Sequence, residues 1–197
     1  MKNKLIVLEG IDGVGKTTIA KMIKRELGRH HIKSVIYEST EKKNSGFNIL
    51  KPFIKKYAAK LSINSSLFFY LSSTLLKSEI IKKMLKNKWV ICDRYIYSTL
   101  AYHKIKGATK SLLPNLNKFP IIKPDFSFLI TVDDKTRLQR VKKRKIINQA
   151  DLIPKKQGSH AYKMETELKK FKLTEVKNDS SLNEAINFIV KKIFPHN

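Results

Sequence analysis

Short runs of apolar residues alternate along the chain with longer stretches in which apolar residues recur every three or four positions. The first run covers residues 5–8 and ends at Gly10; helical spacing then begins at Lys16 and continues to Gly28, where we expect the helix to stop. The same pattern predicts strands at residues 4–9, 34–37, 89–92, 126–132 and 172–176, and helices at residues 16–27, 50–57, 67–85, 96–103, 135–144, 162–171 and 182–193. Strands that alternate with helices are typical of a parallel sheet with helices on both faces.

The length and composition of the chain fit one domain over residues 1–197 without a membrane span. The longest apolar runs, such as residues 5–8 and 126–130, are far shorter than the ~20 residues that a span requires. No signal-peptide pattern precedes the first strand, so we expect a cytoplasmic protein. The one cysteine, Cys92, lies in an apolar strand run, which favours a buried thiol and excludes a disulfide within the chain.

The chain is strongly basic. It has 41 Lys and Arg against 16 Asp and Glu, a net charge of +25, and its lysines are spread along the whole sequence. Such a charge favours anionic partners, either nucleotides or nucleic acid. Because scattered lysines are also typical of ordinary solvated helix faces, charge alone does not separate these classes.

Residues 10–17 read Gly-Ile-Asp-Gly-Val-Gly-Lys-Thr, which fits the phosphate-binding pattern G-x-x-x-x-G-K-[ST] between a strand and a helix. Gly13 and Gly15 let backbone N–H groups turn toward a phosphate chain at the positive end of the helix. Lys16 can reach the β- and γ-phosphates, and the Thr17 hydroxyl is placed for Mg²⁺. The pattern therefore predicts a three-layer α/β P-loop NTPase fold, with about five parallel strands and a short lid. It would bind ATP and Mg²⁺ through Gly10, Asp12, Gly13, Val14, Gly15, Lys16, Thr17 and Thr18.

A longer stretch around the phosphate-binding pattern indicates which class of P-loop protein this is. Residues 8–18 resemble the phosphate loop of thymidylate kinases, in which an acid follows the first glycine by two places. Asp12 matches that acid. The resemblance implies that Asp12 lies where donor and acceptor meet, near the 3′-hydroxyl of the monophosphate and the metal.

Residues 93–95 are Asp-Arg-Tyr, and with Ser98, Ala101 and Tyr102 they match all six positions of a second signature of that family. Ligands of open parallel sheets bind beyond the carboxyl ends of the strands, so Asp93 and Arg94 should stand beside the phosphate loop. The resemblance implies that Arg94 holds the acceptor phosphate, that Asp93 serves the metal and that Tyr102 packs under the sugar. The alternatives are a surface ion pair between Asp93 and Arg94 and a plain core tyrosine.

Glu38 follows the second predicted strand, where the family often has Glu-Pro; here the glutamate is kept and the proline is lost. The resemblance implies that Glu38 orders metal-bound water beside the substrate, the alternative being one more exposed acid. A further family arginine that holds the acceptor phosphate has no arginine counterpart, so Lys51, Lys55 or Lys56 would take its place.

The lid is expected at about residues 141–158. Because position 13 is glycine rather than a basic residue, the resemblance implies that lid arginines stabilise charge on the transferred phosphoryl group. Arg144 is the first candidate and Arg140 the second, on a helix that also carries Arg137. The family's second lid arginine is absent from residues 146–151, and the alternative for the basic cluster is a solvated helix face.

Base recognition departs from the family pattern. Alignment of the helix at residues 67–85 puts Phe69 at the aromatic that stacks on thymine, and Ser72 and Ser73 at the Asp-Arg pair that reads its edge. Stacking accepts any base, whereas hydrogen bonds to a base edge reject wrong partners. Either water, Thr99 or His103 would read the base, or selectivity is loosened.

The resemblance implies an ATP-dependent kinase that converts a pyrimidine deoxynucleoside monophosphate, dTMP first of all, into its diphosphate. Two alternatives stay open: a deoxynucleoside kinase, which would need a base such as Glu38, and a non-enzymatic P-loop protein that binds nucleic acid. We expect neither nucleic acid nor a membrane as a partner. The family commonly forms two-fold dimers, which implies a homodimer here.

Overall fold

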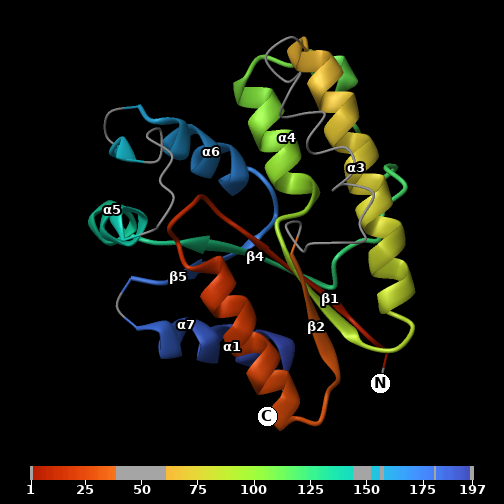
Figure 1. Cartoon of the computed structure of the whole chain (residues 1–197), viewed down its shortest axis with the longest axis vertical. Coiled ribbons are helices and arrows are strands. Elements are labelled where there is room, and N and C mark those ends of the chain that lie inside the picture. Colours follow the sequence, from red (N-terminus) through yellow and green to blue (C-terminus); the bar gives the residue numbers. More distant parts are fainter. Residues whose placement is uncertain (1, 39–60, 144–151, 156–157, 180, 196–197) are drawn as a thin grey trace.

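A five-stranded parallel sheet lies between two layers of helices in the computed structural model of this chain (Figure 1). The structure describes residues 2–38, 61–143, 152–155, 158–179 and 181–195. The strand order is β2-β3-β1-β4-β5, and each neighbouring pair is parallel. The predicted fold class, an α/β protein with a parallel sheet of about five strands, is confirmed.

The strands are β1 (Leu5–Glu9), β2 (Ser34–Glu38), β3 (Trp89–Asp93), β4 (Phe126–Thr131) and β5 (Thr174–Lys177). The central strand β1 pairs with β3 and β4, and its Leu8 lies opposite Asp93 and Phe128. Glu38 ends β2 and is in register with Asp93. The carboxyl ends of these strands therefore meet at one edge of the sheet.

The helices are α1 (Lys16–Arg29), α3 (Ile63–Met84), α4 (Ile96–Ile105), α5 (Asp134–Lys142), α6 (His160–Lys169) and α7 (Leu182–Ile193), with a 3-10 turn η2 (Lys110–Leu112). Helices α1 and α7 cover one face of the sheet, and α3 and α4 cover the other (Figure 1). Helix α6 packs against α4. The predicted helix at residues 50–57 lies outside the described residues.

The first helix does not stop at Gly28, so that prediction is wrong. It continues to Arg29, and the left-handed residue that ends it is His31, with φ 57°. The N–H of His31 donates to Gly28 O at 3.0 Å, and the N–H of Ile32 donates to Leu27 O at 2.8 Å. A left-handed residue satisfies the last carbonyl groups of a helix wherever it stands, and here a histidine fills a position that glycine more often takes.

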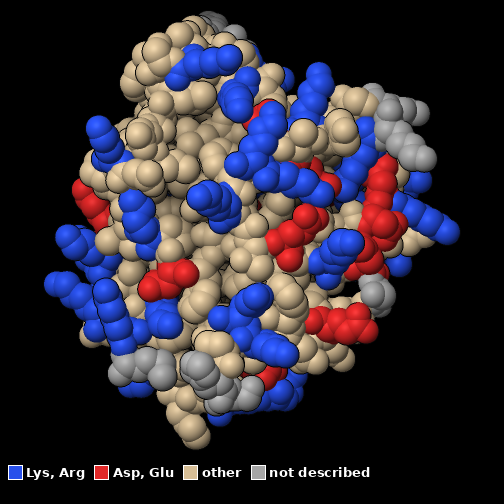
Figure 2. Space-filling model, turned by 180° about the vertical axis from the view of Figure 1, so that it is seen from behind, with Lys and Arg blue, Asp and Glu red and all other residues tan. Residues whose placement is uncertain are grey.

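Lysine and arginine side chains are spread over the whole face that Figure 2 shows, with acidic side chains between them. On this face the positive charge is distributed rather than gathered at one place. Within the described ranges, no helix is both long and apolar enough to cross a membrane.

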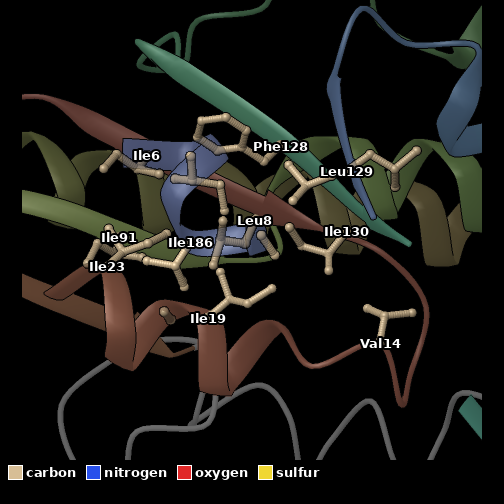
Figure 3. Close-up of a cluster of buried hydrophobic side chains, with 14 of the residues drawn as sticks. Ile6, Leu8, Val14, Ile19, Ile23, Ile91, Phe128, Leu129, Ile130 and Ile186 are labelled. Carbon is tan, nitrogen blue, oxygen red and sulfur yellow. The ribbon is translucent and has the colours of Figure 1, made fainter. Parts of the chain in front are cut away.

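The strand β1 is buried on both of its faces. Leu5 and Val7 belong to the apolar cluster under α3 and α4, whereas Ile6 and Leu8 belong to the cluster under α1 and α7. Figure 3 shows the second cluster, which Val14 from the loop after β1 also joins. Burial of each such side chain stabilises the fold by about 1.5–3 kcal/mol. The loop is therefore anchored in the core at both of its ends.

Candidate active site

The loop between β1 and α1 is packed so closely that its three glycines have no room for a side chain, as Gly13 and Gly15 illustrate. Gly13 has φ 91°, and a Cβ there would lie 2.8 Å from Val141 Cγ2 and 3.0 Å from Arg137 Cγ, both on α5. Gly15, the N-cap of α1, has φ 96°, and a Cβ there would lie 2.6 Å from Asn178 Nδ2. A side chain at either position would be strained and would push the loop away from its neighbours.

This loop borders a cavity of about 290 Å³ at the N-terminus of α1. The N–H groups and the dipole of a helix N-terminus favour anions, so the cavity is suited to a phosphate chain. Two of the predicted loop positions, Gly10 and Val14, are buried and do not line the cavity. The other predicted loop positions line the cavity together with one strand end and α5: Asp12, Gly13, Gly15, Lys16, Thr17, Thr18, Asp93, Arg94 and Arg140.

Lys16 is the loop's cation. Its ammonium group is buried and donates a hydrogen bond to Ile11 O at 3.0 Å. Burial, and after it repulsion by Arg94, lowers the pKa of Lys16 from 10.5 to about 8, against the attraction of three nearby carboxylates. A phosphate chain would bring further negative charge to this group, and therefore favours its charged form.

Thr17 and Asp93 form a candidate Mg²⁺ site. Thr17 Oγ1 donates to Asp93 Oδ2 at 3.2 Å, and Asp93 Oδ1 is buried without a hydrogen-bond partner in the described part of the chain. Mg²⁺ usually takes one or two carboxylates from a protein and its other ligands from phosphates and water. These two oxygens fit that mode, since the described residues contain no larger metal-binding cluster of acidic, histidine or cysteine side chains. The side chain of Glu38, the third predicted metal residue, lies outside the described part.

Arg94 follows β3 in a left-handed backbone conformation, with φ 64°. Such a conformation costs a non-glycine residue roughly 1–2 kcal/mol. Its guanidinium group donates to Asp12 Oδ1 at 3.0 Å and to Ser98 Oγ at 3.1 Å. The ion pair of Arg94 is thus made with Asp12 rather than with Asp93, the partner that the surface-pair alternative assumed.

A second cavity, of about 330 Å³, lies on the other side of Asp12 and Arg94. Its size is that of a small-molecule site. The helices α3, α4 and α6 contribute to its wall, with aromatic rings and polar groups from Tyr70, Ser73, Ser98, Thr99, Tyr102 and His103. Because Asp12 and Arg94 line both cavities, ligands in the two would meet beside these side chains.

Phe69, the predicted stacking aromatic, is not among the residues that line the second cavity. Tyr70, the next residue of α3, lines the second cavity, and Phe69 instead packs edge-on against it, with ring centroids 6.2 Å apart. Ser73 and Thr74 share the face of Tyr70, because residues three and four apart lie above one another on a helix. If Tyr70 takes the place of the aromatic, the family's Asp-Arg pair corresponds to Ser73 and Thr74; with Phe69 it corresponds to Ser72 and Ser73.

His103 lines the same cavity, but both of its ring nitrogens are in contact with protein. Nδ1 lies 2.8 Å from Thr99 O, and Nε2 lies 3.1 Å from Ser66 Oγ. A carbonyl only accepts, so Nδ1 carries the proton and Nε2 accepts from the serine hydroxyl. Burial lowers the pKa of His103, which favours this neutral form. To read a base, His103 would have to give up one of these bonds.

Arg140 and Asn178 hold the phosphate loop from the side of β5. Arg140 donates to Val14 O at 3.4 Å and to Asn178 O at 3.2 Å. The buried Asn178 donates its amide to the same Val14 carbonyl at 2.8 Å. The segment after β5 therefore contacts the phosphate loop directly.

The other two arginines of this region differ in their placement. Arg137 is fully buried, pairs with Asp134 at 2.9 Å and donates to Ile153 O at 3.0 Å, so it holds α5 to the segment after it. Arg144, the first candidate of the lid, lies outside the described residues, as does most of residues 144–157.

Two residues that support Arg94 were not singled out from the sequence. Glu9 is a fully buried carboxylate directly before the phosphate loop, and Lys77 of α3 donates its ammonium group to Arg94 O at 2.6 Å. An acid that ends a wholly apolar strand was a visible signal for Glu9. Nothing in the sequence distinguishes Lys77 from the many other lysines.

Known proteins of one family resemble this chain. A family model described as Thymidylate kinase matches residues 8–189. A probable thymidylate kinase of Methanocaldococcus jannaschii is 30% identical over 158 residues, which cover 80% of each chain. The thymidylate kinase of Buchnera aphidicola subsp. Baizongia pistaciae is 36% identical over 159 residues, covering 77% of this chain and 74% of that one.

Solved structures show the same fold. A thymidylate kinase from Candida albicans superimposes with a TM-score of 0.69 at 18% identity, covering 98% of this chain and 92% of that chain. A thymidylate kinase from Ehrlichia chaffeensis gives a TM-score of 0.63 at 24% identity, covering 98% of this chain and 100% of that chain.

Proposed function

Because this chain belongs to the thymidylate kinase family, we propose that it transfers the terminal phosphoryl group of ATP to dTMP, forming ADP and dTDP. The observation that carries the proposal is the position of Asp12 and Arg94 between two cavities. One cavity has a phosphate loop and the other has aromatic and hydroxyl side chains suited to a nucleoside. This is the arrangement that transfer between two nucleotides requires.

The acceptor supplies its own nucleophile. Its second ionisation lies near pH 6, so a phosphate oxygen is already an anion at neutral pH and no general base is needed. That oxygen bonds to the γ-phosphorus while the bond to the β–γ bridging oxygen breaks, and ADP leaves with the electron pair. Lys16 and Arg94 contribute by placing the two phosphate groups and offsetting their charge.

Thr17 and Asp93 would hold Mg²⁺, with Glu38 ordering water beside it, and bound Mg²⁺ would neutralise charge on the β- and γ-phosphates. Arg144 and Arg140 are proposed to stabilise the transferred group from the lid side. Resemblance to the family further supports a single kinase domain, a cytoplasmic location and a homodimer.

The base site is proposed to accept dTMP with weaker discrimination than an arginine would give. Ser73 and Thr74 both line the acceptor cavity where the family's pair would stand, and both side chains are too short to span the distance that arginine covers. Stacking on Tyr70 would accept any base, so part of the selectivity that a hydrogen-bonded edge provides is missing.

The test is a panel of deoxynucleoside monophosphates with ATP, with and without Mg²⁺, followed by ADP formation. We expect dTMP to be the best acceptor, turnover to require Mg²⁺, and Lys16→Ala to abolish turnover while thermal unfolding stays close to wild type. Turnover of thymidine but not of dTMP would contradict the proposal in favour of a nucleoside kinase. A salt-dependent gel shift without any turnover would contradict it in favour of a nucleic-acid-binding protein.

A further inference from the structure

Glu9 lies at the end of β1 with its side chain fully buried, and the start of α4 surrounds its carboxylate. Oε1 accepts the N–H of Tyr95 at 2.8 Å and the N–H of Ser98 at 3.4 Å. Oε2 accepts the hydroxyl of Ser98. Glu9 lines neither of the two cavities, so its carboxylate does not touch a ligand there and can affect one only through its neighbours or through its charge.

The hydroxyl of Ser98 connects Glu9 to Arg94. A hydroxyl has one hydrogen, and an ionised carboxylate can only accept, so that hydrogen points to Glu9. The lone pairs of Ser98 Oγ are then left for Arg94 Nη1, which donates to it at 3.1 Å. Glu9 therefore determines which way the hydroxyl turns, and makes Ser98 an acceptor on the side of the arginine.

Arg94 is fixed from three directions. Ser98 accepts from Nη1, Asp12 accepts from Nη2 at 3.0 Å, and the backbone carbonyl of Arg94 accepts from Lys77 at 2.6 Å. A guanidinium group that is held at two nitrogens is presented in one orientation, which is what recognition of a phosphate by a planar fork needs. Of these contacts, the one to Ser98 depends on Glu9.

We propose that Glu9 is a positioning residue for the acceptor phosphate, acting on Arg94 through the hydroxyl of Ser98. The proposal rests on the proposed function for the identity of the acceptor, but the arrangement of Arg94 exists without any ligand. Glu9→Gln is the informative change, because the amide has nearly the same shape yet places an N–H donor beside Ser98. The Ser98 hydroxyl then accepts a hydrogen bond from the Gln amide. Its own hydrogen turns away from residue 9 and toward Arg94, so the hydroxyl no longer accepts from Arg94 as well as before.

The kinetic experiment compares wild type, Glu9→Gln, Ser98→Ala and the double variant, with Asp125→Asn as control. Asp125 also accepts a backbone N–H of β1, from Leu5 at 2.8 Å, but at the far end of the strand. We expect Glu9→Gln to raise the dTMP KM about tenfold, the loss of one charge-assisted hydrogen bond, with a much smaller change in ATP affinity, measured without acceptor near pH 6.5, where Lys16 stays charged. The control should keep the dTMP KM of wild type.

The double variant decides whether the effect passes through Ser98. If it does, Glu9→Gln adds little to Ser98→Ala, whereas independent effects would multiply. Multiplying effects, an unchanged dTMP KM, or an equal loss of ATP affinity would each overturn the proposal. Should Glu9→Gln fail to fold, Ser98→Ala alone must still raise the dTMP KM with ATP affinity intact.

An activity-independent measurement separates this proposal from the proposed function. In ligand-free protein with ¹⁵N-labelled arginine, a guanidinium group held at two nitrogens should give resolved N–H signals, assigned to Arg94 with Arg94→Lys. These signals should broaden or vanish in Glu9→Gln and persist in Asp125→Asn. If they persist in Glu9→Gln, the positioning role is refuted even where dTMP turnover is confirmed.

Discussion

Lys16 should make ATP binding depend on pH in the mildly alkaline range. Its ammonium group donates to Ile11 O, and burial together with repulsion by Arg94 lowers its pKa to about 8. The ligand-free protein therefore loses this charge well before an exposed lysine would. ATP binds to the charged form, because the phosphates need a cation in the loop.

The size of the effect follows from the fraction of protein that carries the charge. With a pKa of about 8, roughly three quarters of Lys16 is charged near pH 7.5 and roughly a tenth near pH 9, so the apparent Kd for ATP should rise about eightfold. The terminal phosphate of ATP ionises near pH 6 and does not change charge in this range. The sign for stability is opposite: between about pH 8 and 10.5 the unfolded chain binds more protons than the folded one, so stability of the ligand-free protein rises with pH.

Calorimetric titration of ATP at several pH values, in two buffers with different ionisation enthalpies, measures the Kd for ATP and the number of protons taken up on binding. Uptake of close to one proton per ATP is expected near pH 9, and little uptake near pH 7. Lys16→Met should bind ATP weakly with no such pH dependence. A wild-type Kd that stays constant from pH 7.5 to 9, or a Lys16→Met variant that keeps the same slope, would refute this account of the loop.

Two further predictions concern contacts that the structure adds to the motifs. Asn178→Ala removes the amide that donates to Val14 O at 2.8 Å; we expect a loss of about 1–3 kcal/mol in the free energy of unfolding and a higher ATP KM, with the dTMP KM unchanged. Equal rises in both KM values would show that the contact does not act on the phosphate loop alone. Tyr70→Ala should raise the dTMP KM by more than Phe69→Ala, because only Tyr70 lines the acceptor cavity, and the opposite order would restore the original alignment.

The fold was predictable because its main signals are local. Four consecutive apolar residues before Gly10 indicate a strand buried on both faces, and residues 5–8 are indeed fully buried in β1. The end of α1 was predicted wrongly for the same reason. Gly28 is the residue that most often ends a helix, but an isolated sequence does not show that His31 takes the left-handed position.

The base site was predictable only in part, because it depends on position around a helix. A shift of one residue turns a side chain by about 100° around the axis, so the difference between Phe69 and Tyr70 decides which ring faces the cavity. Alignment back from Leu85 has no signal that fixes this angle. Ser73 lines the cavity and belongs to the aligned pair in either register, so its proposed place beside the base does not depend on the choice between Phe69 and Tyr70.

The supporting contacts of the site are those that sequence motifs describe least well. Glu9 and Asn178 lie far from Ser98 and Val14 in the sequence, and their side-chain hydrogen bonds to these two residues exist only in the folded chain. Both partners, Ser98 and Val14, belong to sequence motifs, whereas Glu9 and Asn178 were not among the predicted site residues. A motif therefore locates the groups that meet substrate, whereas the residues that orient those groups must be found in the structure.

The backbone of Arg94 is held in a left-handed conformation by hydrogen bonds on both sides. Its φ of 64° would suit glycine better, and an arginine there costs roughly 1–2 kcal/mol of backbone strain. Its N–H donates to Leu8 O at 2.9 Å, and its carbonyl accepts from Lys77, so the strained conformation is held by the strand and by α3. Since a glycine would relieve the strain but would lack the guanidinium group, the conformation is explained by what the side chain binds. The strained residue is thus one that lines both cavities.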